Sequence, residues 1–464
     1  MFEVKGDGRE RPWPHRNTPA AIRARRRALE ALPGWRPEDR RIVPDEAANP
    51  GALAATQEAF TAQMVLPVAV VGPLHLEVGV YRADEEGELE ELDRRRERLL
   101  LPLGHTEGGL SASVQRGILA ANRDGGIRTY MVADGMTRDS MYEFETVGEA
   151  LRAARWTVEH ARDMAAWLGA ADHLGGRLPE GRAGRPVISR HARLVGVRPH
   201  VIGSMLHVLF TFVTGEAAGP NMITRNTFAL NEGYVLPRWR EELGLVPRRT
   251  ILEANMGGDK KPSHLYHLEG GHGKTVLAEA ALSHATLRHI LRVEAGDILA
   301  LADAGLHGAH ESGMQSFAFT PASVVAALFV VTGQDLGMVG TSSMAHITAR
   351  RIEPGTLPSD VDPEDAAASR PYRTGGVHLS LKLSGVEVGT VGGGTVLPCA
   401  QTYLRLLGCV GEGSAYRLAQ IVAAAAMALE ISAGASMASP GSREFFRAHW
   451  SRGGVRGHAG GGER

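Results

Sequence analysis

The segment EGGLSASVQRGILAA, residues 107–121, is the stretch of sequence that indicates the fold most clearly. Small and apolar residues recur in it at helical spacing, so we expect a helix with Glu107 at its start. A carboxylate flanked by small residues can lie in a cleft, where burial raises its pKa and suits it to acid–base work. It can equally be a helix N-terminal acid favoured by the helix dipole. The segment alone leaves both interpretations open.

Other short segments also place ionisable side chains beside glycines. GGDKKP, residues 257–262, contains two adjacent lysines in a chain where only five of the 51 basic residues are lysine. Lysine can give up a proton at working pH and arginine cannot, so Lys260 is a candidate for chemistry, although a surface position is the alternative. VVTGQDLG ends an apolar run, so Asp335 is either a buried carboxylate that needs a partner or part of a helix C-terminal turn.

Two glycine-rich segments could approach a ligand closely. GEAAGPNM (215–222) precedes an expected helix and GTVGGGT (389–395) follows an expected strand. Neither has the GxGxxG or GxxxxGK[ST] pattern, so the ordinary Rossmann and P-loop sites are excluded. Each segment by itself could also be only a turn.

Composition excludes several classes of protein. With 51 Lys and Arg against 52 Asp and Glu, the formal net charge of −1 gives no footprint for nucleic acid or an anionic membrane. Two cysteines exclude a disulfide scaffold and a cysteine-based zinc site, and HGAHE (307–311) lacks the HExxH order, so we expect no metal. The N-terminus has no apolar signal region and no apolar run reaches 18 residues, so we expect a cytoplasmic protein without a membrane span.

The hydrophobic pattern also predicts individual elements. Helices are expected around 20–32, 142–168, 275–301, 323–331 and 416–433, and strands within 64–81 and 194–212. The charged stretch 82–98 reads as a solvated connection, and the glycine-rich tail after Trp450 as frayed.

Taken together, the segments resemble 3-hydroxy-3-methylglutaryl-CoA (HMG-CoA) reductases, specifically the catalytic portion of the class I type. The motifs that carry this resemblance occur in family order over about residues 58–450. They are PVAVVGPL (67–74), TEGGLSASVQRG (106–117), ADGMTRD (133–139), SRHARL (189–194), GEAAGPNM, GGDKKP, TGQD (332–335), VEVGTVGGGT (386–395) and FRAHW (446–450).

The resemblance implies an α+β fold with an inserted domain. A large substrate- and CoA-binding domain would comprise residues 58–139 and 253–464, preceded by an N-terminal helical arm at 1–57. A small ferredoxin-like NADP-binding domain, not a Rossmann domain, would be inserted at 140–252. In this family the active site forms between two subunits, so a homodimer or a higher homo-oligomer is expected.

The family reaction is a four-electron reduction of a thioester to an alcohol, which uses two NADPH and releases coenzyme A. The motif match makes Lys260 the residue that stabilises the oxyanion and Glu107 the acid–base residue. Asp335 would couple these two groups, and His449 would protonate the CoA thiolate.

The match also assigns binding roles. Arg138 would hold the free carboxylate of the acyl-CoA substrate, and the other expected substrate-binding residues are Asp259, Lys261 and Glu253. The expected cofactor-binding residues are Ser189, Arg190, Glu216, Gly219, Asn221, Met222, Val391, Gly392 and Gly393. Arg190 favours NADPH because a guanidinium can pair with a 2′-phosphate, and NADH is not excluded.

Several positions depart from the family pattern and leave alternatives open. Glu216 replaces an aspartate, Glu253 replaces a serine and Ser323 replaces an asparagine, while Ala304 stands where a substrate-contacting lysine is usual. An extra carboxylate at Glu253 would repel a dianionic substrate unless it were neutral or turned away. The first alternative is therefore a homologous reductase of another acyl-CoA or of a carrier-bound acyl thioester. The second is a non-catalytic acyl-CoA-binding homologue, which would have no need of all four chemical residues.

Overall fold

The computed structural model describes residues 18–31, 37, 57–61, 64–84, 86–170, 188–268 and 272–458. Most of the expected N-terminal arm therefore lies outside the described residues. The helix expected in it is present as α1 (Pro19–Glu30), where Arg25 donates a hydrogen bond from Nε to the carbonyl oxygen of Phe60 at 3.2 Å.

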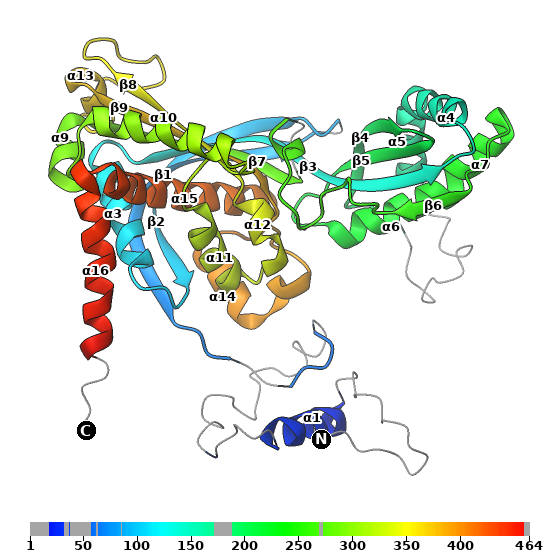
Figure 1. The fold of residues 1–464 in the computed structure, drawn as a ribbon, viewed down its shortest axis with the longest axis horizontal. Coiled ribbons are helices and arrows are strands. Elements are labelled where there is room, and N and C mark those ends of the chain that lie inside the picture. Colours follow the sequence, from blue (N-terminus) through cyan, green and yellow to red (C-terminus); the bar gives the residue numbers. More distant parts are fainter. Residues whose placement is uncertain are drawn as a thin grey trace.

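A six-strand path in the order β2-β1-β3-β7-β9-β8 forms the main sheet (Figure 1). Its strands are β1 (Val68–Ala83), β2 (Leu89–Gly104), β3 (Ile127–Glu143), β7 (Gly273–Ser283), β8 (Ala345–Ile352) and β9 (Gly376–Val386). Neighbouring strands pair antiparallel except β1 and β3, which are parallel at Leu76 and Ile127.

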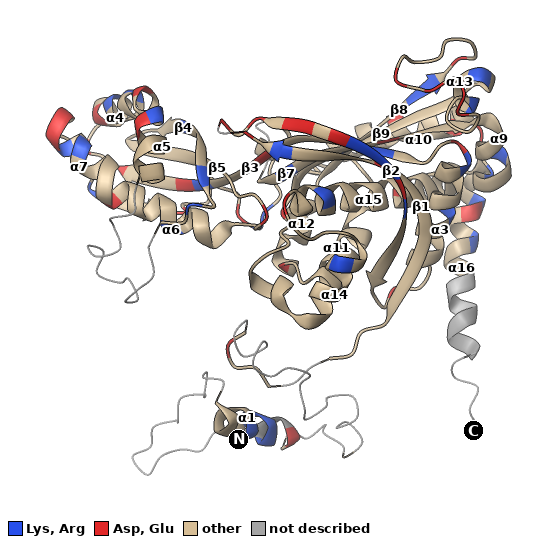
Figure 2. Ribbon diagram, turned by 180° about the vertical axis from the view of Figure 1, so that it is seen from behind, with Lys and Arg blue, Asp and Glu red and all other residues tan. Residues whose placement is uncertain are grey.

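Two predictions for this sheet are wrong. The charged stretch expected to be a connection forms much of the edge strand β2, along which acidic residues are followed by basic ones (Figure 2). The helix expected from Thr275 begins instead as strand β7, whose alternating burial is hidden in the sequence because Val276, Leu277 and Ala278 put apolar residues on both faces.

The sheet is covered by helices, and the long helix α15 (Ser414–Ala438) is buried along most of its length. It packs on α3 (Leu110–Arg123), α10 (Ala295–Glu311) and α11 (Pro321–Thr332), and Gly117 of α3 admits the backbone of Ala428 because a Cβ there would lie 1.7 Å from its carbonyl oxygen. The remaining helices are α8 (Leu265–Leu268), α9 (His284–Thr286), α12 (Val339–Ser342), α13 (Arg370–Thr374), α14 (Pro398–Leu406) and α16 (Arg443–His458).

β3 continues beyond the main sheet into a second sheet. Its first half pairs with β7 up to Gly135, and from Met136 it pairs with β5 (Met205–Val213) and then with β6 (Arg249–Leu252). With β4 (Arg193–Ile202) beside β5, the all-antiparallel order is β4-β5-β3-β6. The strand–helix–strand–strand–helix–strand order of this segment is that of a ferredoxin-like unit, which agrees with the α+β, non-Rossmann expectation.

The helices of this second unit are α4 (Val147–Glu159), α5 (Ala161–Ala170) and α6 (Pro220–Leu230). One long helix was expected over 142–168, but the structure has two, divided at His160. α6 continues through π-helical turns at Asn231–Val235 and Trp239–Leu243, with α7 (Leu236–Arg238) between them. The unit has its own hydrophobic core around Trp239 and extends to one side of the main sheet (Figure 1).

Within the described residues, one helix, Ser414–Ala438, is long and apolar enough to cross a membrane by length and composition. Its most apolar window is 72% buried by the rest of the protein, as in the core helix of a globular domain.

Candidate active site

The candidate site lies where the chain passes between the two sheets. β3 crosses this junction from the main sheet to the second sheet and carries Arg138. The chain returns through the turn after β6, which contains GGDKKP. This turn is held in an unusual backbone conformation, with positive φ at Glu253, Asn255 and Lys260. Non-glycine residues with positive φ store strain and are enriched at functional sites.

Lys260 and Asp335 form the ion pair at the centre of the site. Lys260 Nζ lies 2.7 Å from Asp335 Oδ2, and both side chains are about half exposed, at 48% and 44%. The other carboxylate oxygen of Asp335 accepts a hydrogen bond from the backbone N–H of Gly337 at 2.9 Å, which fixes the carboxylate. The hydrogen bond to Asp335 raises the pKa of Lys260, so the ammonium is the stable form at neutral pH.

Gly337 also makes room for the lysine. A Cβ at this glycine would lie 3.0 Å from Lys260 Cδ and 3.3 Å from Nζ, so a larger residue would crowd the ammonium. The structure thus brings the predicted residues Lys260 and Asp335 into contact.

Arg138 is enclosed by two carboxylates of the same turn. Its Nη1 lies 2.7 Å from Glu253 Oε2 and 3.3 Å from Asp259 Oδ2, and the arginine side chain is only 4% exposed. Three of the four predicted substrate-binding residues thus meet. The fourth, Lys261, is exposed, and its ammonium makes no hydrogen bond or ion pair with any residue that the structure describes.

His272 and Glu387, which the sequence did not single out, extend this cluster into the interior. His272 Nε2 lies 3.6 Å from both Asp259 Oδ1 and Glu387 Oε2, and the histidine and glutamate side chains are fully buried. Contact with His272, together with the Arg138 guanidinium, lowers the pKa of Asp259 to about 2. Among the described residues, Asp259, His272 and Glu387 are the kind of group that can hold a metal ion, with ligand atoms within 4.8 Å of one another.

Glu387 is suited to hold a proton near neutral pH. Burial raises its pKa to about 7. The Thr341 hydroxyl donates a hydrogen bond to Glu387 Oε1 and also lies 2.9 Å from the carbonyl oxygen of Met338. This hydrogen bond and the nearby His272 oppose the effect of burial on the pKa of Glu387 without cancelling it.

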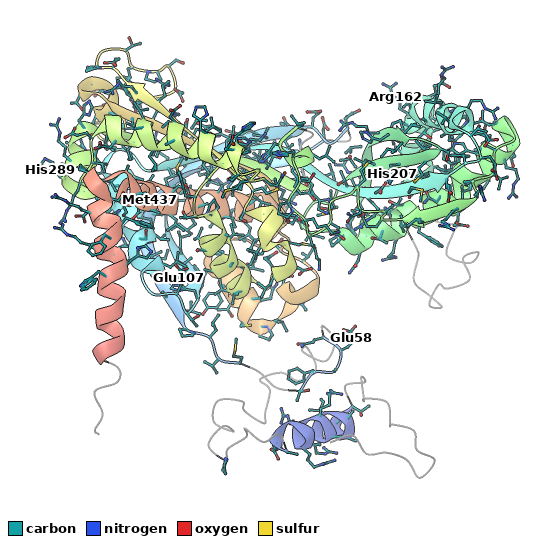
Figure 3. The ribbon with its side chains drawn as sticks, in the orientation of Figure 1. Glu58, Glu107, Arg162, His207, His289 and Met437 are labelled. Carbon is teal, nitrogen blue, oxygen red and sulfur yellow. The ribbon has the colours of Figure 1, made fainter. Side chains whose placement is uncertain are left out.

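Glu107 and His449 are not in contact with the Lys260–Asp335 pair within one chain. Glu107 is exposed in the turn before α3, below the main sheet in the view of Figure 3. His449 is exposed on α16, where its Nδ1 lies 2.9 Å from the carbonyl oxygen of Phe445. In both Figures 1 and 2, α16 stands at the opposite end of the molecule from the β4–β5 unit.

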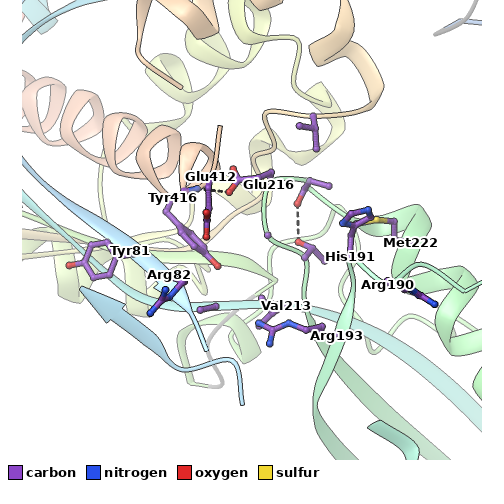
Figure 4. Close-up of a pocket in the computed structure, with 16 residues that line it drawn as sticks. Tyr81, Arg82, Arg190, His191, Arg193, Val213, Glu216, Met222, Glu412 and Tyr416 are labelled. Carbon is purple, nitrogen blue, oxygen red and sulfur yellow. Dashed lines mark hydrogen bonds between the residues drawn. The ribbon is translucent and has the colours of Figure 1, made fainter. Parts of the chain in front are cut away.

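A cavity of about 390 Å³ lies beside the junction, between β1, β4 and the start of α15 (Figure 4). Four predicted cofactor residues line it, namely Arg190, Glu216, Met222 and Val391. Arg82 and Arg193 line the same cavity, and the sequence motifs did not identify them as cofactor residues. Guanidinium groups are suited to phosphate groups, although Arg82 already forms an ion pair with Glu90 at 2.9 Å.

Glu216 joins the two sheets. Its Oε1 accepts from the backbone N–H of Gly413 and its Oε2 from that of Ala415, both at 2.7 Å, so the carboxylate caps the N-terminus of α15. Its backbone carbonyl oxygen also accepts from the N–H of Thr390 at 2.7 Å. The Glu216 carboxylate, which was expected to face the cofactor, therefore binds backbone N–H groups at the N-terminus of α15.

The other predicted cofactor residues lie around the rim. Ser189 donates its hydroxyl to Met222 Sδ at 3.1 Å, and the buried side chain of Asn226 fixes the Ser189 turn through hydrogen bonds of 2.7 and 2.9 Å. Gly219 precedes α6 with φ 98°, and a Cβ there would lie 2.4 Å from Thr214 Cγ2, so only glycine fits. Asn221 follows on α6 and is exposed.

The glycine loop after β9 is open to a ligand. Gly392 and Gly393 have φ of 76° and 54°, and a Cβ on either would meet nothing within 4 Å. Gly389, at the start of the loop, packs so closely on the GEAAG segment that a Cβ would lie 2.5 Å from the backbone nitrogen of Ala218. The two glycine-rich segments thus pack on each other, and the 391–393 face remains free.

Comparisons with known proteins identify relatives of this chain. The model of the hydroxymethylglutaryl-coenzyme A reductase family matches residues 21–453. The 3-hydroxy-3-methylglutaryl-coenzyme A reductase of Aeropyrum pernix is 31% identical over 84% of this chain and 80% of its own length, and that of Halobacterium salinarum is 31% identical over 84% and 83%. A solved class II reductase from Streptococcus pneumoniae, bound to NADPH, has a TM-score of 0.55 at 16% identity, covering 89% of this chain and 96% of its own, which shows a similar fold.

Proposed function

Because the chain belongs to the hydroxymethylglutaryl-coenzyme A reductase family, we propose that it reduces the thioester of HMG-CoA to mevalonate and releases coenzyme A. The observation that carries this proposal is the 2.7 Å contact between Lys260 Nζ and Asp335 Oδ2 at the junction of the two sheets. It holds an ammonium at a partly open position, and Asp259, the preceding residue, contacts the buried guanidinium of Arg138.

Lys260 stabilises the negative charge that develops on the thioester oxygen when hydride attacks the carbonyl carbon. An ammonium held in place by Asp335 needs little reorganisation to do so. The same charge stabilisation serves the second reduction, in which the aldehyde becomes an alkoxide and takes up a proton. NADPH supplies the hydride in both steps.

Glu107 supplies the proton for the second step, and His449 protonates the departing CoA thiolate. Since both side chains are exposed and apart from Lys260 within one chain, they reach a reacting thioester from a second copy of the chain. We therefore propose a homodimer, or a higher homo-oligomer, with shared active sites. The large aromatic side chains of Phe446 and Trp450, 62% and 75% exposed, lie beside His449 and fit a surface that is covered on assembly.

The cavity of Figure 4 fits a phosphate-bearing dinucleotide. Arg82, Arg190 and Arg193 can pair with phosphates, and the N-terminus of α6 and the open face of the glycine loop add backbone N–H groups. This donor set favours NADPH over NADH, because a 2′-phosphate adds charge for a guanidinium to bind.

The proposed division of the chain follows from the same assignment. Residues 58–139 and 253–464 form the large substrate- and CoA-binding domain, and residues 140–252 form the small NADP-binding domain. We propose a cytoplasmic location and no metal requirement, and we expect partners other than the acyl-CoA, the cofactor and further copies of the chain to be unnecessary for turnover.

A second candidate keeps the chemistry and changes the acyl group. The contact between Arg138 and Glu253 favours it, because a carboxylate of the protein already occupies the guanidinium that would hold the free carboxylate of HMG-CoA. A non-catalytic acyl-CoA-binding protein is less well supported, since such a protein has no need for the Lys260–Asp335 pair.

The test is to incubate the purified protein with HMG-CoA and either NADPH or NADH and to identify the product by mass spectrometry. We expect mevalonate and free coenzyme A, formed faster with NADPH. Mevalonate formation that is equal with both nucleotides would overturn the cofactor assignment, and no mevalonate with a folded, NADPH-binding protein would overturn the choice of substrate.

A further inference from the structure

Both Nη atoms of Arg138 are occupied by groups of this chain, and its Nε is buried without a hydrogen-bond partner among the described residues. Nη1 contacts Glu253 Oε2 at 2.7 Å, both Nη atoms lie 3.3 Å from Asp259 Oδ2, and Nη2 lies 3.5 Å from the carbonyl oxygen of Pro220. With 4% of its side chain exposed, Arg138 offers no open face to a further anion. A substrate carboxylate that is to bind Arg138 must first displace a carboxylate of the protein.

The local backbone holds Glu253 in this position. Glu253 follows the last residue of β6 with φ 65°, and its backbone N–H donates to the carbonyl oxygen of Asp139 at 2.8 Å, one residue from Arg138. Its carboxylate lies against Gly257, where a Cβ would be 2.5 Å from Oε2, so glycine is required for this placement. The second carboxylate oxygen, Oε1, is buried and has no hydrogen-bond partner in the structure. It can accept a hydrogen bond from a ligand.

The charges around the junction do not favour another carboxylate. The two cations Arg138 and Lys260 face three carboxylates, those of Glu253, Asp259 and Asp335, each in contact with one of them. Lys261 is exposed to water, where an ammonium attracts a carboxylate only weakly. A distal carboxylate on the acyl chain therefore enters a region where carboxylates outnumber the cations that they contact.

We infer that Glu253 is a specificity-determining residue that competes with the distal carboxylate of the acyl substrate for Arg138. It disfavours an acyl chain that ends in a carboxylate relative to one that ends in an uncharged or hydrogen-bond-donating group. This inference rests on the proposed function, since it concerns the acyl end of the thioester that the enzyme reduces.

A pair of matched thioesters tests the inference. HMG-CoA and 3-hydroxy-3-methylbutyryl-CoA share the thioester and the tertiary alcohol, but the second has a methyl group where HMG-CoA has a carboxymethyl group. In Glu253→Gln, which has nearly the same shape and no charge, we expect kcat/KM for HMG-CoA to rise at least about tenfold through a lower KM, with kcat little changed. We expect kcat/KM for the uncharged thioester to stay within about threefold of the wild-type value.

The inference is overturned if the ratio of the two kcat/KM values is the same in wild type and Glu253→Gln, or if both values fall together. Glu232→Gln removes a carboxylate from the exposed surface of the small unit and should leave the ratio unchanged. Should Glu253→Gln not fold, as judged by circular dichroism, Glu253→Ser with the same two thioesters replaces it.

The failure of the proposed function gives a different result. If the wild-type protein binds NADPH but oxidises it with neither thioester, the proposed substrate is wrong. The inference is then decided by titration calorimetry of both thioesters with wild type and variant. Tighter binding of HMG-CoA alone by Glu253→Gln supports it, and equal binding overturns it. If the wild-type protein reduces either thioester and the ratio does not respond to Glu253→Gln, the inference alone fails.

Discussion

Asp335 acts on the reaction through the charge of Lys260. Its carboxylate raises the pKa of that lysine by accepting a hydrogen bond from the ammonium. The protonated lysine is the active form, so activity is present below the pKa of Lys260 and is lost as the pH rises through it. The Asp335→Asn substitution removes the negative charge and lowers this pKa, which moves the alkaline decline of kcat to lower pH.

The measurement is the pH dependence of kcat between pH 6 and 11 for wild type and Asp335→Asn, at about equal spacing. Asp303→Asn, which alters an exposed carboxylate on α10, is the control and should leave the profile unchanged. An Asp335→Asn profile with the wild-type alkaline limb would mean that Lys260 is not the group that this carboxylate keeps charged.

Glu387 makes stability depend on pH. Burial raises its pKa from 4.5 to about 7 in the folded state, so the folded protein binds this proton more tightly than the unfolded chain. The stabilisation is fully present below about pH 4.5 and is lost as the pH rises to about 7, at a cost of about 3 kcal/mol. Glu387→Gln cannot ionise, so its stability relative to wild type should increase between pH 5 and pH 8.

Urea denaturation at these two pH values provides the comparison. A stability difference between wild type and Glu387→Gln that is the same at pH 5 and pH 8 would contradict the raised pKa.

The predicted residues were found mainly through motifs, and the missed ones include Arg193 and Glu387, which lie within quoted motifs, as well as residues outside them. Lys260 and Asp335 belong to contiguous motifs, and they meet as expected. His272 and Arg82 lie outside the motifs. They reach the site only because β7 begins beside β3 and β1 ends beside β4, and single-sequence spacing does not contain that information.

Among the helices and strands, those whose residues share one kind of environment along their length were predictable from the sequence. The apolar helix α15 and the hairpin of β4 and β5 lie where the sequence placed them. β2 was missed because it is an edge strand, where exposed charged side chains such as those at Asp93–Arg96 are tolerated and discourage pairing with other chains. β7 was missed because its sequence has apolar residues on both faces and so lacks the period of two that its burial shows.

The N-terminus of α15 depends on a residue from the other sheet. Glu216 accepts two backbone N–H groups of this helix end at 2.7 Å and a hydroxyl hydrogen bond from Ser414 at 2.6 Å. We expect Glu216→Ala to destabilise the protein by about 1–2 kcal/mol, because it removes a charged cap. It should also raise the KM for NADPH, because the cap ties the cavity wall to α15.

Thermal unfolding and NADPH titration of Glu216→Ala measure the two effects. Glu412→Ala, which changes a neighbouring carboxylate that lines the same cavity, is the matched control for loss of charge alone. Unchanged unfolding in Glu216→Ala would mean that the cap is not energetically important.

At the scale of the whole molecule, the proposed assembly has a direct consequence. If Glu107 and Lys260 of one active site come from different chains, a heterodimer of Lys260→Ala and Glu107→Gln contains one site with both changes and one intact site. Both homodimers should be inactive. Co-expression of the two variants at equal levels should then restore about a quarter of wild-type activity, because half of the dimers are mixed and each has one working site.

The two variants are co-expressed with different affinity tags, and the doubly purified mixed dimer is assayed. No activity in this mixed dimer would contradict a site shared between chains. It would require Glu107 to reach Lys260 by a rearrangement within one chain.

The most direct test of the central claim is the stoichiometry of the reaction. NADPH oxidation is followed at 340 nm with HMG-CoA as the limiting substrate, while the free thiol of coenzyme A is titrated in the same sample. The account predicts two NADPH oxidised for each thiol released, and no oxidation above background with Lys260→Ala that still folds and binds NADPH. One NADPH per thiol, or full activity in Lys260→Ala, would contradict it.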